Sequence, residues 1–452
     1  EGNQYILLVY KKYKDVRLVG TPPKSLGKYG GDTDNWMWPR HTADFSMFRI
    51  YADANNEPAE YSKDNVPYKP KKFLPISIKG VEEGDFAMIF GYPGRTNRYD
   101  VSYGIDIAIN ETNPSIVKAR EKRLEIMRKN MKLDKSVYLK LTSSYAGISN
   151  YWKYFIGQTE QLKRLKIVKQ KQQEESEFIY WARNNAPEYK DIMRQFEAIH
   201  NAYRPYAKHS AYYSQAFQGS ILSAMGAEFY DLYAELNKNK PDQKKIDEEV
   251  KGLKSGRKSM MKRFDMATEK EIFTEMNKMF YNDIPKNQHP EVYQNVIFKK
   301  FSNSNMDKTF ADYTEFVFAN TILLDTAKFK ALLENPTVEA MMDDAALRYA
   351  LSFAKNYQEV YEPKIEKYRT EKEALKKKYI RGLMEMKKDG LFYPDANSTM
   401  RITYGQVLSY SPQDAVHFDY YTTLDGFMDK YKPGDDEFDA PMELVNLHKT
   451  KD

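Results

Sequence analysis

Residues 31–50 hold the densest group of side chains in the sequence that could take part in chemistry. The segment contains two of the four tryptophans, three acids, Arg40 and His41, and it then changes into the alternating pattern of a β-strand. Polar and aromatic groups gathered at the start of a strand are typical of a site that a rigid scaffold presents. We therefore expect this segment to carry a binding or catalytic site.

Asp44 is the residue of this segment that best fits a catalytic role. It opens the alternating run 44–50, and a second run, 84–94, joins a Gly-Asp turn to a strand that ends in Gly-Tyr-Pro. Together the two runs resemble the first barrel of chymotrypsin-like serine peptidases of the bacterial Deg/HtrA type. In such enzymes an aspartate holds the Nδ1–H of the catalytic imidazole. The alternative for Asp44 is a turn cap, which the second run makes the weaker hypothesis.

His41 lies three residues before Asp44, which at first sight suggests a His–Asp pair. In chymotrypsin-type order, however, the histidine precedes the aspartate by a long span and comes from a separate loop. We therefore predict a structural role for His41, and ordinary core packing for Trp38.

Other common kinds of site have no support in the sequence. There is no cysteine, which excludes thiolate nucleophiles and cysteine-based zinc sites. The six histidines are scattered without ligand spacing, and zincin, P-loop, dinucleotide and nucleophile-elbow motifs are absent. No apolar run approaches the ~18 residues that a membrane span needs. We expect no metal, no cofactor and no membrane span, and the mild net charge of +6 gives little reason to expect a nucleic-acid partner.

The rest of the sequence indicates strands at both ends and helices between them. Residues 1–100 contain short Val-, Ile-, Tyr- and Phe-rich runs separated by turn residues, and residues 396–452 return to this pattern. Residues 101–395 follow helical periodicity, with Asn113-Pro114 as a helix start and 365–386 as a late helix. The expected strands cover residues 5–10, 45–50, 73–78, 85–90, 400–408 and 420–423. The predicted fold is multidomain α+β, with a partial chymotrypsin-like β-barrel, a large inserted α-helical domain and the start of a second barrel.

Two longer motifs make the resemblance to a peptidase more specific. Residues 32–46 (DTDNWMWPRHTADFS) and 145–153 (YAGISNYWK) resemble the signatures of the bacterial dipeptidyl-peptidases seven and eleven. These are serine exopeptidases with a double-barrel peptidase domain and a large helical domain inserted in it. The resemblance spans essentially the whole chain.

The resemblance implies roles for five residues. Asp44 would be the aspartate of the triad. Asn35, and Asn150 from the helical domain, would accept hydrogen bonds from the free α-ammonium of the substrate, while Trp36 and Arg40 would shape that pocket. Amide oxygens and an aromatic face suit such a cation, to which the cation–π contact contributes about 0.5–2 kcal/mol. The residue types alone would also allow core packing for Trp36 and a helix cap for Asn150.

The same resemblance implies partners and a location. The substrates would be oligopeptides with a free N-terminus, the compartment the periplasm or cell envelope of a Gram-negative bacterium, and a homodimer is compatible with it. The helical domain would act as a lid that brings Asn150 opposite Asn35. Nothing in the sequence selects a hydrophobic or an acidic residue before the cleaved bond.

The resemblance also predicts what this stretch of sequence lacks. The family's histidine would lie before Glu1 and its serine after Asp452, so we expect no peptidase activity from these 452 residues alone. The rival hypothesis is a non-catalytic protein that binds peptides with a helical bundle. A gene that does not continue into a Gly-Asn-Ser-Gly-like segment would favour the rival.

Overall fold

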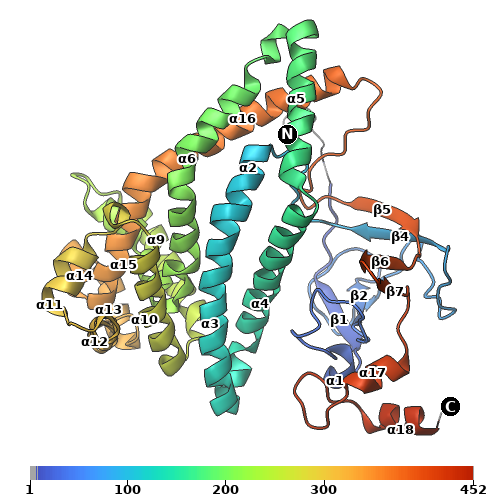
Figure 1. Ribbon diagram of the computed structural model, residues 1–452. Coiled ribbons are helices and arrows are strands. Elements are labelled where there is room, and N and C mark those ends of the chain that lie inside the picture. The colour runs from blue at the N-terminus through green and yellow to red at the C-terminus, as the bar shows by residue number, and fades with distance from the viewer. Residues whose placement is uncertain (1–6, 8, 451–452) are drawn as a thin grey trace. The chain divides into compact units, whose positions relative to one another are not determined.

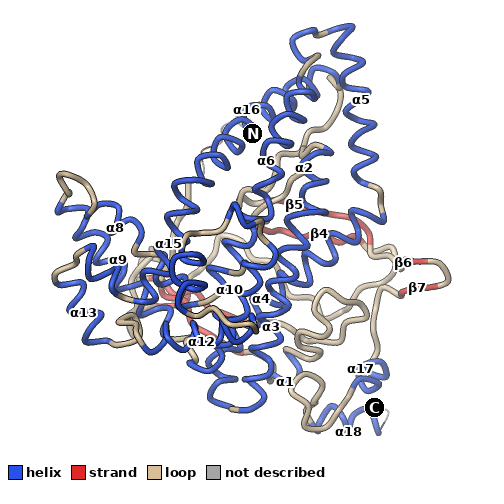
Figure 2. Tube along the Cα trace, turned by 60° about the vertical axis from the view of Figure 1, so that its left-hand side comes forward, coloured by secondary structure: helices blue, strands red, loops and turns tan. Residues whose placement is uncertain are grey.

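The chain forms two compact units. The computed structural model describes residue 7 and residues 9–450. The helical unit is Tyr99–Phe392, and the strand unit combines the segments before Tyr99 and after Phe392 (Figure 1). Figure 2 shows that helix dominates the former and that the short strands belong to the latter. The predicted α+β class with a large helical part is therefore confirmed.

Two long helices, joined by one residue, form one side of the helical unit. α3 (Asn113–Leu133) begins where the Asn-Pro pair predicts a start, and it runs beside α4 (Lys135–Arg164) in Figure 1. Asp134 between them is extended, and its carboxylate accepts a hydrogen bond of 2.6 Å from the Ser136 amide. This side chain satisfies one of the free N–H groups at the start of α4.

The other helices of this unit are mostly shorter. They are α2 (Ser102–Ile107), α5 (Ile167–Asn185), α6 (Ile192–Gln215), α7 (Ile221–Ala227), α8 (Tyr230–Leu236), α9 (Gln243–Met261), α10 (Met266–Asp283), α11 (Phe298–Lys300), α12 (Met306–Ala319), α13 (Thr326–Glu334), α14 (Val338–Asp343), α15 (Ala345–Lys355) and α16 (Glu362–Met386). Short 3-10 or π turns connect several of them, at Ala108–Thr112, Pro187–Tyr189, Phe217–Gly219, Lys286–Gln288, Tyr293–Ile297 and Asn356–Tyr361. The predicted late helix is confirmed as α16.

Aromatic side chains fill the main core of the helical unit. The rings of Phe217 and Phe353 stack with their centroids 4.5 Å apart, and Phe353 is 2% exposed. Leu124 and Met127 of α3 are buried in the same cluster. Burial of one such side chain contributes about 1.5–3 kcal/mol to stability, which makes this cluster the main source of stability in the unit.

A second, smaller core joins α5, α6 and α16. Phe178 and Tyr379 meet edge to face with their ring centroids 5.0 Å apart, and Phe196 packs against Tyr379. Gly382 permits this close approach of α16, because a Cβ atom there would lie 2.7 Å from the ring of Phe178.

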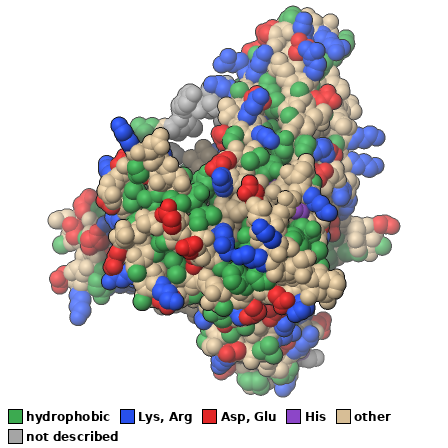
Figure 3. All heavy atoms as spheres, turned by 90° about the vertical axis from the view of Figure 1, so that its left-hand side faces the viewer, with side chains coloured by type: hydrophobic (Ala, Val, Ile, Leu, Met, Phe, Trp, Pro, Cys, Tyr) green, Lys and Arg blue, Asp and Glu red, His purple; other side chains and the backbone are tan. Residues whose placement is uncertain are grey.

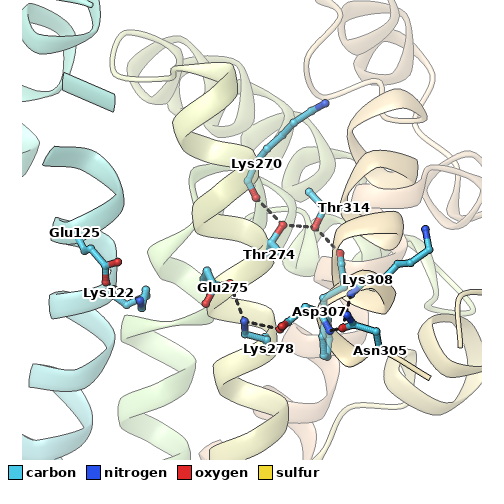
Figure 4. A network of polar contacts seen from close by, with 11 residues as sticks. Lys122, Glu125, Lys270, Thr274, Glu275, Lys278, Asn305, Asp307, Lys308 and Thr314 are labelled. Carbon is cyan, nitrogen blue, oxygen red and sulfur yellow. Dashed lines mark hydrogen bonds and ion pairs between the residues drawn. The ribbon is translucent and has the colours of Figure 1, made fainter. Parts of the chain in front are cut away.

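Polar contacts connect α10 to α12 at the surface of the helical unit. Lys278 donates hydrogen bonds of 2.8 Å to both Glu275 and Asp307, and the hydroxyls of Thr274 and Thr314 lie 2.7 Å apart (Figure 4). On the face drawn in Figure 3, basic and acidic side chains are interspersed, as expected for solvated helix surfaces.

The strand unit contains three small antiparallel sheets. β1 (Asp15–Gly20), β2 (Met47–Ala52) and β3 (Val66–Pro67) form the first, in that order. In the second, β4 (Phe86–Gly91), which precedes the helical unit, pairs with β5 (Arg401–Gln406), which follows it. The third sheet and the helices of this unit are β6 (Tyr410–Gln413), β7 (Val416–Phe418), α1 (Lys24–Gly27), α17 (Leu424–Lys430) and α18 (Met442–Thr450). β5, which the sequence assigned to a second barrel, is thus paired with a strand of the first segment.

Two of the predicted strands are wrong. Residues 73–78 form no strand, because none of the described segments pairs with them, and an unpaired strand leaves its backbone groups unsatisfied. Residues 420–423 lead instead into α17, where the hydroxyl of Thr423 accepts a hydrogen bond from the Gly426 amide. Of the predicted strand 5–10, only residues 7, 9 and 10 lie within the described residues, and none of the three is in a strand.

Candidate functional site

The predicted site lies in the loop between α1 and β2 of the strand unit. The loop turns sharply at Gly30 and Gly31, whose φ values are +82° and +45°. Glycine suits this turn because side chains are strained in that backbone region. At Gly30 a Cβ atom would also come within 2.5 Å of Asp34, whose amide donates a 2.8 Å hydrogen bond to the Gly30 carbonyl.

Glu437 fixes the first part of this loop. Its carboxylate accepts hydrogen bonds from the Asp32 amide at 2.9 Å and the Thr33 hydroxyl at 2.6 Å. Its carbonyl accepts a third, of 2.8 Å, from the Gly30 amide. Three bonds from one residue hold the turn that leads into the predicted pocket.

Lys430 fixes the second part. Its ammonium donates to the Asp34 carboxylate at 2.8 Å and to the Pro39 carbonyl at 3.1 Å. Asp34 is 7% exposed, so this charge is buried and needs its partner. The hydroxyl of Thr422 adds a 2.8 Å hydrogen bond to the Arg40 carbonyl. Residues almost 400 positions later in the chain thus determine the shape of the loop.

A small apolar core lies against the loop 30–44 and supports its contacts with Glu437 and Lys430. Tyr29 stacks on Phe427 with ring centroids 3.7 Å apart, and its hydroxyl donates a 2.7 Å hydrogen bond to the Phe427 carbonyl. Ala440 and Val445 complete the buried cluster. The loop therefore rests on packed side chains from α17 and α18.

Asn35, Trp36 and Arg40 lie together on this supported loop. Trp36 is 61% exposed, and its backbone has a φ of +60°, a conformation that costs a residue with a side chain about 1–2 kcal/mol. Asn35 and Arg40 are half-buried, and no acceptor among the described residues reaches the buried Nε of Arg40. The core-packing alternative for Trp36 is wrong, because most of its indole is accessible.

Asp44 lies three residues before the first residue of β2, with an exposed side chain. The backbone just before it is tied to α1, since the Thr42 hydroxyl donates to the Gly27 carbonyl at 2.9 Å and the Ala43 amide donates to Leu26 at 3.1 Å. Within the described part of the chain the Asp44 carboxylate accepts no hydrogen bond, so it does not cap a turn. It is an exposed carboxylate shortly before β2, on a backbone that hydrogen bonds tie to α1.

His41 packs against α17. Its Nε2 lies 2.7 Å from the position that a Cβ atom on Gly426 would take, and its Nδ1 is buried. Burial is the main cause that lowers the pKa of His41, and the neighbouring Lys430 ammonium lowers it further. The neutral imidazole is therefore favoured here.

One serine, one histidine and one aspartate do meet on the β6–β7 hairpin. The Ser411 hydroxyl lies 3.5 Å from Nδ1 of His417, and Nε2 of His417 lies 3.6 Å from Asp419. All three side chains are exposed, and both distances exceed those of an activated triad. This set has the residue types of a triad without its geometry.

Asn150 lies in the middle of α4, in the helical unit, so the helix-cap alternative is wrong. Its neighbours in the second motif are firmly held. The Tyr145 hydroxyl accepts a 2.9 Å hydrogen bond from Arg128, and Ser149 is buried. The structure thus places four of the five predicted residues in one loop of the strand unit and the fifth on a rigid helix of the other unit.

Sequence reasoning missed Lys430 and Glu437. Neither belongs to a motif, and one lysine or glutamate in a charged C-terminal segment carries no signal that it contacts a loop so far away in sequence. Among the described residues, no three histidine, aspartate or glutamate side chains gather as metal ligands. No helix in that part of the chain is both long and apolar enough to cross a bilayer.

Comparisons with known proteins agree with the motifs. A sequence model of the peptidase S46 family matches residues 1–452. The Asp/Glu-specific dipeptidyl-peptidase of Flavobacterium psychrophilum is 38% identical over 458 residues, and dipeptidyl-peptidase 7 of Phocaeicola vulgatus is 36% identical over 453. Each match covers 100% of this chain and 62% of the relative, so the chain spans less than two thirds of their length.

Solved structures resemble the chain as well. DPP11 of Porphyromonas endodontalis in complex with the dipeptide Arg-Glu matches with a TM-score of 0.83 and 28% identity, over 97% of this chain and 62% of that one. The same protein in an alternate conformation matches with a TM-score of 0.66 and 26% identity, over 97% and 60%.

Proposed function

The chain belongs to the peptidase S46 family, and on this premise we propose that the protein is a serine dipeptidyl-peptidase that releases dipeptides from the free N-terminus of oligopeptides. The observation that carries the proposal is the loop 30–44. It combines an exposed indole, an amide, a guanidinium and a carboxylate on a backbone held by Lys430 and Glu437. Named relatives with dipeptidyl-peptidase activity support it.

The α-ammonium of the substrate binds, in this proposal, beside Asn35 and Trp36. The amide oxygen of Asn35 accepts a hydrogen bond from the ammonium, and the indole face of Trp36 attracts the cation. The left-handed backbone of Trp36 supports this assignment, because strained backbone conformations are found mainly at functional sites, where the surrounding structure holds them. A pocket that requires a free amine makes the enzyme an exopeptidase.

Asp44 serves the chemistry in this proposal. Its carboxylate accepts a hydrogen bond from Nδ1–H of the general-base histidine, which sets the tautomer and stabilises the imidazolium during acyl transfer. The exposed carboxylate at the fixed entrance to β2 supports this role. For Asn150, on α4, the proposal is that its amide oxygen also accepts a hydrogen bond from the substrate α-ammonium.

The natural full-length protein gives the test of the proposal. In Asp44→Asn we expect kcat to fall by about 10⁴, because the imidazole is then held in the wrong tautomer. Asp419→Asn, in the exposed hairpin, is the matched control and should keep full activity. Retention of more than a tenth of kcat in Asp44→Asn, with a normal melting temperature, would reject the role of Asp44.

Trp36→Gly tests the amine pocket separately. Glycine accepts the left-handed backbone without strain, so we expect the melting temperature to change little while KM for a free dipeptide substrate rises at least tenfold. An unchanged KM would remove Trp36 from the pocket.

The choice of side chain before the cleaved bond is a separate question. The two kinds of relative, Asp/Glu-specific and type 7, are almost equally similar to this chain, at 38% and 36% identity. We propose a location in the cell envelope and a homodimer, to be tested by cell fractionation and by light scattering of the purified protein.

A further inference from the structure

A pocket of about 480 Å³ lies inside the helical unit, away from the loop 30–44 in the sequence. α3, α4, the turn Phe217–Gly219 and α10 line it, and all of its residues belong to the helical unit. Such a volume is in the range of sites for small molecules. The pocket includes one face of the second motif, through Gly147, Ile148 and Tyr151.

Three arginines line this pocket, and none forms an ion pair with a carboxylate within the described part of the chain. Arg120 donates to the Gln215 side chain at 2.8 Å and to the Ile148 carbonyl at 3.3 Å, both neutral acceptors. Arg263 is exposed, whereas Arg123 lies deeper. Guanidinium groups that face a cavity, and whose charges the neighbouring acids balance only in part (Glu269 beside Arg123), form an arrangement suited to an anion.

The side chain of Arg123 has a buried donor that is not satisfied within the described part of the chain. Its Nε is buried, and no acceptor from the described residues reaches it. Burial, together with the neighbouring charges of Arg120 and Arg263, lowers the pKa of Arg123 to about 10. Gly219 leaves space for this side chain, because a Cβ atom there would lie 3.1 Å from Cδ and 3.2 Å from Nε of Arg123.

The two acids in the pocket wall, Glu269 and Asp265, use their carboxylates to accept hydrogen bonds at helix starts. Glu269 is 2% exposed, and its carboxylate accepts hydrogen bonds from the Ser220 hydroxyl at 2.5 Å and the Leu222 amide at 3.1 Å. Asp265 caps α10 by accepting from the Thr268 amide at 3.0 Å. Both carboxylates thus stabilise helix starts, and the positive charge of the pocket exceeds the negative.

The rest of the pocket wall is apolar, with Met127, Leu141, Ile148 and Ile272 among its residues. An inorganic ion would leave this apolar surface exposed to water. An organic acid would cover it, and each Å² of apolar surface buried would favour binding by about 25 cal/mol. We infer that this pocket binds a small organic carboxylate, with its carboxylate group on Arg120, Arg123 and Arg263 and its apolar body on the residues from α3, α4 and α10.

Isothermal titration of the full-length protein with 3-phenylpropanoate tests the inference. We expect saturable binding, at least tenfold weaker binding of the uncharged 3-phenylpropionamide, and weak binding of inorganic phosphate. A free dipeptide and its C-terminal amide identify the biological source: preference for the dipeptide over 3-phenylpropanoate indicates a peptide carboxylate, and the reverse indicates a free acid. Phosphate binding as tight as that of 3-phenylpropanoate, or equal binding of the amide, would overturn the inference.

Variants locate the binding. Arg123→Gln should weaken binding of 3-phenylpropanoate at least tenfold, whereas Arg194→Gln, at an exposed arginine of α6, should leave it unchanged. If Arg123→Gln does not fold, Arg263→Gln at the exposed wall and Gly219→Ala beside the Arg123 side chain give the same test. Asn35→Ala should have no effect, which separates this site from the proposed amine pocket. Unaltered affinity in the folded arginine variants would overturn the inference, whatever the peptidase assays show.

Discussion

The helical unit and the strand unit differ in how far their apolar side chains are buried. Among the described residues, the main buried cluster and the second, smaller one consist only of helical-unit residues, whereas the strand unit has a still smaller cluster around Tyr29 and Phe427. Its strands leave many apolar side chains exposed, among them Leu18, Phe48, Phe86, Ile89, Phe90, Ile402 and Tyr404, which are 50–74% exposed. The difference shows that the helical unit has a complete core of its own, while two- and three-stranded sheets cannot bury theirs without further contacts.

The predicted site lies beside the small buried core of the strand unit. The loop 30–44 rests on the small core and on Glu437 and Lys430, whereas β2, which follows it, leaves Phe48 exposed. A site that must position polar groups needs rigid support, and the small core with Glu437 and Lys430 supplies it.

The largest effect expected from this comparison is on folding in isolation. The segment Tyr99–Phe392 alone should be soluble, helical by circular dichroism and cooperative in thermal unfolding, because the main buried cluster and the second, smaller one lie within it. Residues 9–98 and 393–450, produced together without it, should show no cooperative transition. A helical unit that aggregates or melts without cooperativity would contradict the comparison.

Substitution of one phenylalanine in each unit tests the difference in burial at single sites. Phe353→Ala in the main helical core should lower the free energy of unfolding by about 3–5 kcal/mol. Phe86→Ala on β4, where the side chain is 69% exposed, should change it by no more than about 0.5 kcal/mol. Urea denaturation of the 452-residue chain provides the measurement. Equal losses in the two variants would mean that β4 is as well packed as the helical core.

A buried histidine makes the helical unit sensitive to acid. Burial lowers the pKa of His209 from 6.5 to about 4. Between these values the unfolded chain binds the proton and the folded chain does not, so stability falls as the pH drops from about 6.5 to about 4, by up to about 3 kcal/mol. His209→Phe should flatten this dependence of the unfolding free energy on pH. An unchanged pH dependence in His209→Phe would show that burial of His209 is not the cause.

Glu269 has the opposite dependence. Burial raises its pKa from 4.5 to about 7, so the folded chain holds a proton that the unfolded chain loses, and stability falls as the pH rises from about 4.5 to about 7. Glu269→Gln keeps an oxygen to accept from Ser220 and Leu222 and should raise the melting temperature at pH 8 but not at pH 4. A lower melting temperature at pH 8 would show that the ionised carboxylate stabilises the pocket.

A further effect on stability concerns the contacts that support the loop 30–44. Lys430→Met leaves the Asp34 carboxylate buried without its partner and should cost about 1–3 kcal/mol in the strand unit, together with loss of activity. Lys430→Arg should restore much of both. Hydrogen exchange of the amides in 30–40 should rise in Lys430→Met alone; unchanged exchange would show that other contacts hold the loop.

The sequence predicted what local pattern determines. The apolar periodicity of α3 and α16, the Asn-Pro start of α3 and the grouping of Asn35, Trp36, Arg40 and Asp44 depend on residues near one another in the chain. Pairing partners are not local, which is why the apolar run 73–78 was wrongly predicted as a strand. Lys430 and Glu437, and the three arginines around the helical pocket, become recognisable only when segments far apart in sequence come together.

The proposed amine pocket on the loop 30–44 is tested most directly by the ratio of kcat/KM for a free and for an N-acetylated substrate. In the full-length protein, kcat/KM for a chromogenic dipeptide with a free N-terminus is compared with that for the same dipeptide after N-acetylation, in the wild type and in Asn35→Ala. We predict strong preference for the free amine in the wild type and loss of most of that preference in Asn35→Ala at an unchanged melting temperature. Equal cleavage of the two substrates by the wild type would contradict the account.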